Sequence, residues 1–402
     1  MFLSQLKLTN FRMFEHLEFD LPNGATIILG NNGQGKTSLL EAIYLLAISR
    51  AFRAENEREV VNWKSIDSTS PTIVDAIVHG VEGRTRVIIG YHLLKKNPIT
   101  QDLSTDIIHF GVKKEIKVGG VKRNSSGLIG FVTAVLFSAQ DINLVLGPPS
   151  TRRRFLDILI SQSSRQYFQS LQKYQRGLKQ RNSILRGIRN GTSQLSELDF
   201  WNDLLITEGL ILMFRRLEVL TSLGSKASTF LSGLTDNKEC LSVVFRPTIK
   251  LLDSINNTRE EFAKSLHQSI QRDIQTGTTQ FGPHRDDFEL SVNDSDMRIF
   301  SSRGQARSIA LALRLAEASH ISSPESEPII LLDDILSELD THRRERILET
   351  ISAYNQPIIT TTNLGDFKES FLKKSTIFRA HQGNITPYEH DTPMEKAPEG
   401  FE

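Results

Sequence analysis

The 402-residue sequence lacks most of the features that mark secreted, membrane or disulfide-rich proteins. Its single cysteine, Cys240, excludes an intrachain disulfide and a cysteine-clustered zinc site. No apolar run approaches the roughly 20 residues that span a bilayer, and Ala42–Ile48 is among the longest. The first residues lack the basic and apolar regions of a signal peptide. We therefore expect a cytoplasmic protein that has no contact with a membrane.

The sequence also lacks a strong net charge, with 48 Lys and Arg against 47 Asp and Glu. Any surface for nucleic acid must therefore come from local segregation of charge. Residues 158–196 contain several Lys and Arg but no Asp or Glu, whereas the segment after Pro387 is acidic and rich in proline. The first segment is a candidate nucleic-acid surface, and the second is typical of a solvated tail.

Residues 30–37 match the phosphate-binding motif G-x-x-x-x-G-K-T (Walker A), between an apolar run at 25–29 and a helical stretch at 38–49. Glycines let backbone N–H groups wrap a phosphate, Lys36 can reach the β- and γ-phosphates, and the Thr37 hydroxyl can ligate Mg²⁺. The motif therefore predicts bound ATP with Mg²⁺. The expected nucleotide-binding residues of this segment are Gly30, Asn31, Asn32, Gly33, Gln34, Gly35, Lys36, Thr37 and Ser38.

A second motif, Ile329–Leu332 followed by Asp333 and Asp334, has the Walker B form. Four apolar residues are typical of a parallel strand buried on both faces, whose carboxyl end opens onto the ligand crevice. We expect Asp333 to hold Mg²⁺ and Asp334 to position or deprotonate the attacking water, with Lys36 as a further catalytic group. An alternative for Asp334, compatible with the first, is that it caps the following helix.

Lys36 and Asp333 lie 297 positions apart (333 − 36), so a large insertion must leave and rejoin the nucleotide core. Glycine-rich turns predict β-hairpins over 72–124, and the chain reads as helical from about 151 to 233. A strand over 241–245 and a helix over 258–276 follow, and helices then alternate with strands. The pattern predicts an α/β fold with an ATP-binding lobe (1–150 and 277–402, with the hairpins as a subdomain) and an inserted helical arm lobe (151–276).

Residues 300–305 open a helix predicted over 306–318, and Ser302 and the Gly304 amide stand where a helix start can grip an anion. One phosphate loop already serves one nucleotide, so a second such site is most useful in trans, on the γ-phosphate held by a partner's Lys36. Ser302, Gly304 and Gln305 are therefore candidate nucleotide contacts, and Ser302 is a candidate catalytic residue. The alternative from these residues alone is a well-capped helix.

Together, the two Walker motifs, the Ser302–Gln305 signature, Ser337–Asp340 and the threonines 360–362 that end the next strand resemble the ABC-type P-loop ATPase heads of the SMC/Rad50 group. Within that group the chain is similar to the RecF family. The stretches that carry this second resemblance are 9–12, 137–141, 147–148, 151–157 and 282–287. The resemblance implies a mixed β-sheet lobe with a helical arm, a nucleotide contact by Arg12 and a metal contact by Gln140. The sequence departs from the family at Ala139-Gln140, where Pro-Glu is expected.

The resemblance also implies a function. Members of the family form ATP-driven homodimeric clamps on duplex DNA near single-strand gaps, with slow DNA-stimulated ATP hydrolysis. They act in recombinational repair, replication restart and the response to DNA damage, where they assist RecA loading with RecR and RecO. Two alternatives remain open: an ABC-head nuclease of the OLD type, which needs a further carboxylate-rich metal site, and a transporter ATPase subunit, against which the Walker spacing argues.

Basic residues at the start of the predicted arm are the candidate DNA contacts. Each phosphate that they neutralise would release counterions, so we expect binding to weaken steeply with salt. The alternative is a solvated helix face. The candidates are Arg152, Arg153, Arg154, Lys173, Arg176, Lys179 and Arg181. A second candidate surface is the predicted hairpin, with Lys113, Lys114, Lys117, Lys122 and Arg123.

Overall fold

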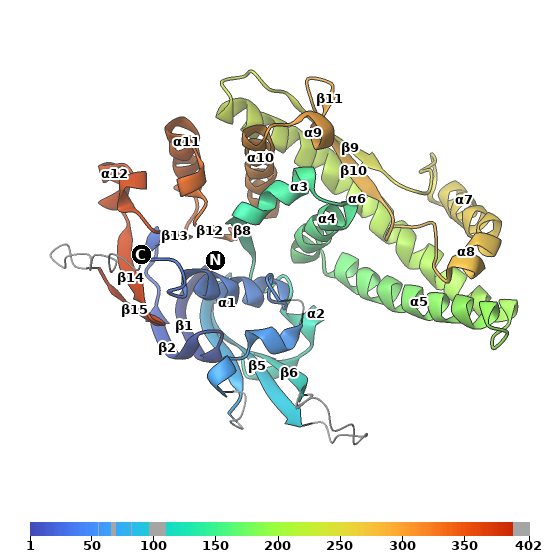
Figure 1. Cartoon of the computed structure of the whole chain (residues 1–402), viewed down its shortest axis with the longest axis horizontal. Helices are drawn as coiled ribbons and strands as arrows, with labels where there is room; N and C mark the ends of the chain where they lie inside the picture. Colours follow the sequence, from blue (N-terminus) through green and yellow to red (C-terminus); the bar gives the residue numbers. More distant parts are fainter. Residues whose placement is uncertain (55, 66–69, 82, 96–109, 389–402) are drawn as a thin grey trace, which may run out of the picture.

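The structure is a computed structural model, and it describes residues 1–388 except 55, 66–69, 82 and 96–109. Two six-stranded sheets form one end of the molecule, and long helices extend from them to the other end (Figure 1). The expected α/β fold is therefore confirmed.

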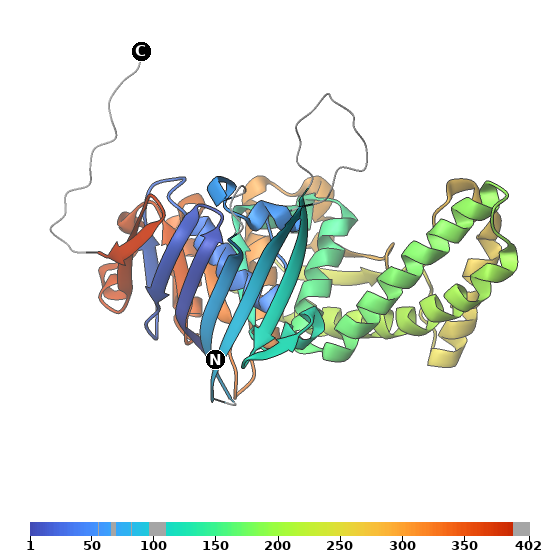
Figure 2. The same cartoon turned by 90° about the horizontal axis from the view of Figure 1, so that it is seen from below.

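The N-terminal sheet is antiparallel, with the strand order β2-β1-β4-β5-β6-β7 (Figure 2). Alternation of buried and open positions along its first strands is the pattern of a sheet with one face on the core. Because β4 pairs with β1, the predicted hairpins extend this sheet and form no subdomain of their own. Its strands are β1 (Phe2–Phe11), β2 (Phe14–Asp20), β4 (Thr72–Gly80), β5 (Gly83–Lys95), β6 (Phe110–Val118) and β7 (Val121–Arg123).

The central sheet has the order β15-β14-β3-β13-β12-β8, and its strands are parallel except for the edge strand β15. The Walker A strand β3 and the Walker B strand β12 are not neighbours, since β13 lies between them. The carboxyl ends of all three meet at one edge. The strands are β3 (Thr26–Leu29), β8 (Ala134–Ser138), β12 (Ile329–Asp333), β13 (Pro357–Thr361), β14 (Thr376–His381) and β15 (Asn384–Pro387).

Helix α1 (Lys36–Ile48) lies between the two sheets (Figure 1). It is apolar on all sides, and ten of its thirteen residues are buried, as expected for a helix that contacts core on both faces. Its side chains belong to one hydrophobic cluster with Leu6 and Val74 of the N-terminal sheet and Leu136 and Leu331 of the central sheet. The packing fixes the start of α1, where the phosphate loop ends.

Long helices account for most of the inserted segment, as predicted, and they project away from the sheets (Figure 2). They are α4 (Pro149–Ser163), α5 (Arg165–Arg189), α6 (Asp199–Leu234), α7 (Ile255–Gln268) and α8 (Ile270–Thr276). The expected single helix over 258–276 is wrong, because the chain breaks at Ser269, which ends α7 and precedes α8.

A three-stranded sheet, in the order β11-β10-β9, joins the helices to the nucleotide core. Its strands are β9 (Leu241–Arg246), β10 (Asp287–Val292) and β11 (Ser295–Asp296). Strand β9 lies in the predicted arm and β10 in the predicted ATP-binding lobe, so the sheet crosses the expected boundary. One hydrophobic cluster likewise contains Phe137 of the central sheet together with Leu205 and Leu223 of α6. The arm is thus built onto the core by continuous packing.

The remaining helices border the central sheet. They are α10 (Arg303–Ile321) and α11 (Thr341–Ile351), the short α2 (Ser125–Leu128), α3 (Asn143–Leu146), α9 (Met297–Phe300) and α12 (Glu369–Leu372), and the 3₁₀ turns η1 (Glu57–Val60), η2 (Trp63–Ser65), η3 (Ala139–Ile142), η4 (Leu195–Leu198), η5 (Leu336–Glu338) and η6 (Leu364–Asp366). Over the described ranges, no helix has the length and apolarity needed to cross a bilayer.

Candidate nucleotide-binding site

The phosphate loop turns between β3 and α1 through positions that require glycine. Gly35 has φ +101°, which strains any residue with a side chain, and a Cβ there would lie 2.7 Å from Met13 Sδ. At Gly30 a Cβ would lie 2.6 Å from the carbonyl oxygen of Ala380, on the neighbouring strand β14. A backbone atom of a paired strand cannot swing aside. The loop's curvature therefore requires one glycine, and its packing requires the other.

Lys36 is buried at the first position of α1 and folds back over the loop. Its Nζ donates to the carbonyl oxygens of Gly30 (2.5 Å) and Asn31 (3.0 Å). Burial lowers the pKa of Lys36, while Asp334 and Asp333 act in the opposite direction. No side chain caps the start of α1. The free helix amides and the adjacent ammonium group fit a phosphate chain.

The Walker B strand brings its first aspartate to the loop. Thr37 Oγ1 donates to Asp333 Oδ1 at 2.8 Å, and Thr360 Oγ1, at the end of β13, lies 3.2 Å from the same oxygen. Burial raises the pKa of Asp333, and the two hydroxyl hydrogen bonds oppose that shift. A hydroxyl and a carboxylate oxygen are ligands that Mg²⁺ accepts alongside substrate phosphates. Thr37 and Asp333 thus fit the predicted metal. Thr360, which the sequence marked only as part of the family resemblance, is a further member of the site.

Asp334 has a strained backbone and an unsatisfied side chain. Its φ is +51°, in the left-handed region, and its N–H donates to Thr360 Oγ1 at 3.0 Å. Oδ1 is buried and has no hydrogen-bond partner among the described residues. Burial raises the pKa of this carboxyl group, and Lys36 opposes the shift. The alternative role as a helix cap is wrong, because no side chain caps the following turn η5. A half-buried carboxylate with a raised pKa fits a general base.

Gln140 and Arg12, the two contacts implied by the family resemblance, lie at the borders of this region. Gln140 is exposed in η3, two residues beyond the end of β8, whose last residue Ser138 pairs in register with Asp333. Arg12 is engaged elsewhere: Nε and Nη2 donate to Glu41 of α1 at 2.7 and 2.9 Å, and Nη1 donates to the Glu59 carbonyl oxygen. A metal contact by Gln140 and a nucleotide contact by Arg12 stay predictions.

The signature residues form a complete helix cap in the single chain. Ser302 Oγ accepts from the Gln305 N–H at 3.2 Å, and Gln305 Oε1 accepts from the Ser302 N–H at 3.1 Å. Ser302 and Gly304 are exposed. No hydrogen bond or ion pair within the described ranges joins Ser302, Gly304 or Gln305 to residues 30–38 of the same chain. The signature of one chain therefore does not complete its own phosphate site.

A buried ion-pair network, not predicted from the sequence, joins the signature helix to η3. Arg314 on α10 contacts Asp141 at 2.6 Å and Glu317 at 2.7 Å. Burial raises the pKa of Glu317, and Arg314 opposes the shift. The signal was present in the sequence, since Arg314 and Glu317 are charged residues, three apart, inside the otherwise apolar run 309–318 of α10. The network connects the turn that carries Gln140 to the helix that begins at the signature.

Two of the predicted DNA contacts are wrong. Arg152 is 1% exposed and bonds both oxygens of Asp287, with the shorter distance 2.7 Å. Arg181 is 0% exposed and bonds Asp273 at 2.8 Å. Buried arginines paired with carboxylates hold the helices together and cannot reach a DNA backbone.

The other predicted contacts are accessible. Arg154 and the α5 residues Lys173, Arg176 and Lys179 are exposed, although Lys173 pairs with Glu208 at 3.0 Å. Arg153 is half-buried, and its Nη1 donates to the Asp286 carbonyl oxygen.

The second candidate surface, on the hairpin, is partly neutralised. Lys114 pairs with Glu57, and Lys117 and Lys122 both lie 3.7 Å from Glu115. The hairpin is therefore the weaker candidate.

His284–Asp287 make structural contacts. His284 bonds the Tyr174 hydroxyl at 2.7 Å, and Asp286 Oδ1 accepts from the Thr248 N–H at 2.8 Å. Across the part of the chain that the structure describes, no group of three or more His, Cys, Asp or Glu side chains could hold a metal ion.

Comparison with known proteins shows the family of the chain. The family model "RecF/RecN/SMC N terminal domain" matches residues 2–386. The chain is 34% identical over 390 residues to the DNA replication and repair protein RecF of Bacillus mycoides (strain KBAB4), covering 96% of this chain and 98% of that protein. It is also 34% identical over 389 residues to the RecF of Bacillus cytotoxicus.

Solved structures give the same result. A structure of the recombination mediator protein RecF with ATP superposes with a TM-score of 0.84 at 29% identity, covering 96% of this chain and 98% of that one. An Smc head bound to the C-winged helix domain of ScpA has a TM-score of 0.51 at 12% identity, a likeness of fold alone. The chain therefore belongs to the RecF family, within the SMC/Rad50 group of ABC-type ATPases.

Proposed function

We propose that this chain is an ATP-dependent DNA-binding protein of recombinational repair and replication restart, acting in the cytoplasm. ATP and Mg²⁺ join two copies, the dimer clamps duplex DNA near single-strand gaps, and slow hydrolysis opens the clamp. In this role the protein assists RecA loading together with RecR and RecO. Support comes from the family, whose curated members are named DNA replication and repair proteins, and whose solved member binds ATP in the RecFOR pathway.

The observation that carries the proposal is the contrast between two half-sites. Thr37 at the end of the loop is already hydrogen-bonded to Asp333 in the single chain, an arrangement that fits phosphate and Mg²⁺. Ser302 stands at an exposed helix start that has no hydrogen bond to that site in its own chain, over the described ranges. A symmetric dimer presents the same surface twice, so each signature can meet the partner's phosphate loop. When bound, Mg²⁺ would neutralise charge between the phosphates, held by Thr37 and Asp333.

Equilibrium sedimentation tests the dimer directly. We expect a monomer without nucleotide and a dimer with ATP and Mg²⁺ at micromolar protein, since two ATP molecules supply contacts that neither surface has alone. A monomer that persists with saturating ATP would refute the trans site.

Asp334→Asn tests the proposed general base. The amide keeps the size of the side chain but cannot take up a proton, so hydrolysis should fall by about 10²–10⁴-fold. ATP binding and dimerisation should be retained, because Thr37 and Asp333 are unchanged. Single-turnover hydrolysis beside ATP titration measures both. Asp333→Asn is the matched control, which should impair Mg²⁺-dependent ATP binding as well.

The DNA path is proposed to run over Arg153, Arg154 and the exposed basic residues of α5. Arg154→Ala with Lys179→Ala should weaken duplex binding and reduce the slope of log K against log salt by about one for each DNA phosphate that is no longer neutralised. Arg152 is left intact, since removing it would strand Asp287 in a buried pair. An unchanged slope would place the DNA elsewhere.

We also propose that the chain works as two lobes, with residues 1–150 and 277–402 binding ATP and residues 151–276 forming the arm lobe. The β9–β10 pairing then acts as the joint between them. Hydrogen exchange with and without ATP tests this division, since the two segments of the ATP-binding lobe should gain protection together.

A further inference from the structure

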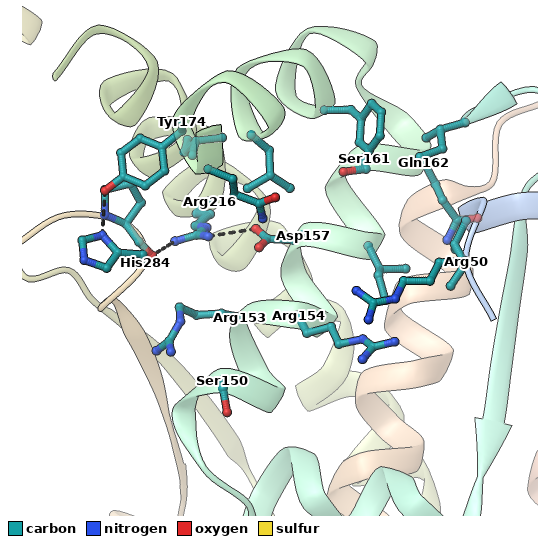
Figure 3. Close-up of a pocket in the computed structure, with 18 of the residues that line it drawn as sticks. Arg50, Ser150, Arg153, Arg154, Asp157, Ser161, Gln162, Tyr174, Arg216 and His284 are labelled. Atoms are coloured by element: carbon teal, nitrogen blue, oxygen red, sulfur yellow. Dashed lines mark hydrogen bonds and ion pairs between the residues drawn. The ribbon is translucent and has the colours of Figure 1, made fainter. Parts of the chain in front are cut away.

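A pocket outside the nucleotide site lies where α1, α4, α5 and α6 meet (Figure 3). Its volume is about 340 Å³, near the lower limit of pockets that bury a small organic ligand. The lining is mainly apolar, with Ile158 of α4, Phe168 and Leu171 of α5 and Leu212 of α6. It therefore suits a ligand with a flat or apolar body.

The entrance of the pocket is cationic. Arg50, just beyond α1, and Arg153 and Arg154 of α4 lie along one side of the pocket (Figure 3), and Arg50 and Arg154 are exposed. Burial lowers the pKa of Arg154, and the nearby positive charge of Arg50 adds to that effect. The one carboxylate in the lining, Asp157, is already paired with Arg216 at 2.8 Å. Arg153 and Arg154 thus bring positive charge to this side of the pocket, which suits an anionic group.

Two buried polar groups in the lining lack partners. Ser161 and Gln162 are each 4% exposed, and among the described residues neither Ser161 Oγ nor Gln162 Nε2 has a hydrogen-bond partner. Gln162 Oε1 is used, since it accepts from the Ala134 N–H at 2.9 Å, so the amide orientation is fixed and Nε2 is left over. Buried donors without partners are costly, which points to a ligand with hydrogen-bonding edges.

We propose that this pocket binds one unpaired nucleotide, with the base in the apolar depth and its phosphates at the arginine entrance. Phe168 offers an aromatic face to the base, while Ser161 and Gln162 can bond its edge. As part of DNA, such a nucleotide would occur where a duplex meets a single-strand gap. A nucleotide that is part of DNA rests on the proposed function. A free nucleotide has the same base and phosphate chemistry and does not depend on that function.

The position also connects the pocket to ATP. Arg50 follows the carboxyl end of α1, the helix whose first residue is Lys36. Because α1 is enclosed by both sheets, a ligand at one end contacts the same rigid element that holds the phosphates at the other.

The test uses the full chain with ATP and Mg²⁺, and measures anisotropy of a fully paired duplex and of the same duplex with a short gap. Arg154→Ala should weaken binding of gapped DNA about fivefold more than binding of paired DNA, the effect of losing roughly one ion pair with a phosphate at the pocket entrance. Ser161→Ala, which removes only the unpartnered hydroxyl, should act in the same direction with a smaller factor. Lys179→Ala, outside the pocket, is the matched control and should weaken both DNAs equally.

A thermal-shift assay with free dTMP and dAMP distinguishes a nucleotide within DNA from a free nucleotide as the ligand. Stabilisation that Arg154→Ala removes, without any preference for gapped DNA, would support the pocket but assign it to a free nucleotide. If the wild-type chain binds no DNA, the proposed function fails, and the dTMP and dAMP shifts still decide the pocket. The proposal is overturned if Arg154→Ala and Lys179→Ala act alike on both DNAs and neither mononucleotide stabilises the wild type.

Discussion

The starts of α1 and α10 are both helix ends that can face phosphate, and they are prepared in opposite ways. The α1 start is buried, has no side-chain cap and has Lys36 against it. The α10 start is exposed, and Ser302 and Gln305 already satisfy each other across its first turn. One end is ready for a ligand in the single chain, whereas the other must exchange internal hydrogen bonds for external ones. This difference fits a first binding step within one chain and a second that requires two.

Ser302→Arg should have the largest effect, and it acts only on the start of α10. A long cation at the exposed start of α10 would prevent the partner's loop from approaching, so we expect ATP hydrolysis at background level and no ATP-dependent dimer. ATP binding should equal that of the wild type, because the residues that form the phosphate loop are untouched. Sedimentation and hydrolysis assays measure the loss, and normal turnover by this variant would show that Ser302 does not act in trans.

Lys36→Ala should act on the start of α1. Losing a charged donor beside the phosphates removes about 3 kcal/mol of binding, which corresponds to roughly 100-fold in the Kd for ATP. Titration with a fluorescent ATP analogue measures it, and folding should be unchanged by circular dichroism. If this variant bound ATP normally but failed to dimerise, the assignment of ATP binding to the α1 start and of dimerisation to the α10 start would be wrong.

The two ends should also differ in their response to pH. Burial lowers the pKa of Lys36, so as pH rises the free chain loses this positive charge earlier than an exposed lysine would. ATP binding, which needs the charged form, should then weaken by up to about tenfold per pH unit above that pKa. Lys36→Arg is the control, since a guanidinium stays charged and should abolish this dependence. Wild-type affinity that is constant up to about pH 10, near the ordinary lysine pKa, would contradict the expectation.

The smallest effect concerns the cap of α10. Ser302→Ala should lower the free energy of unfolding by about 1 kcal/mol, because the Gln305 N–H loses its acceptor. Ser302→Gly should cost less, since glycine lets water reach the helix start. Urea unfolding of both variants measures the difference. Equal stabilities for wild type and Ser302→Ala would mean that the cap is not an important interaction in the single chain.

The sequence predicted the phosphate loop and the Walker B strand because their chemistry is local. Gly30, Gly35 and Lys36 stand at fixed spacings, and the apolar run before Asp333 identifies a buried parallel strand by itself. The contact of Thr360 with Asp333 escaped prediction because it depends on the strand order, which places β13 between β3 and β12.

The basic residues of the arm show where such prediction fails. In the sequence Arg152 and Arg154 look alike, yet one is buried against Asp287 and the other is exposed. The partners of Arg152 and Arg181 lie 135 and 92 positions away, so no local pattern distinguishes a structural arginine from one that faces solvent. The same reason conceals the pocket, whose lining comes from four helices and from loop residues such as Pro283 and His284.

From the sequence alone one can predict a nucleoside triphosphate site and where the phosphate loop, the candidate metal ligands and the long helices occur. These follow from residue type, spacing and period, which act over one turn or one strand. Only the tertiary structure decided which charges are neutralised inside the molecule, which hydroxyls meet Asp333, and that Ser302 does not reach its own chain's phosphate loop. Burial and pairing depend on segments that are distant in sequence, and packing alone brings them together.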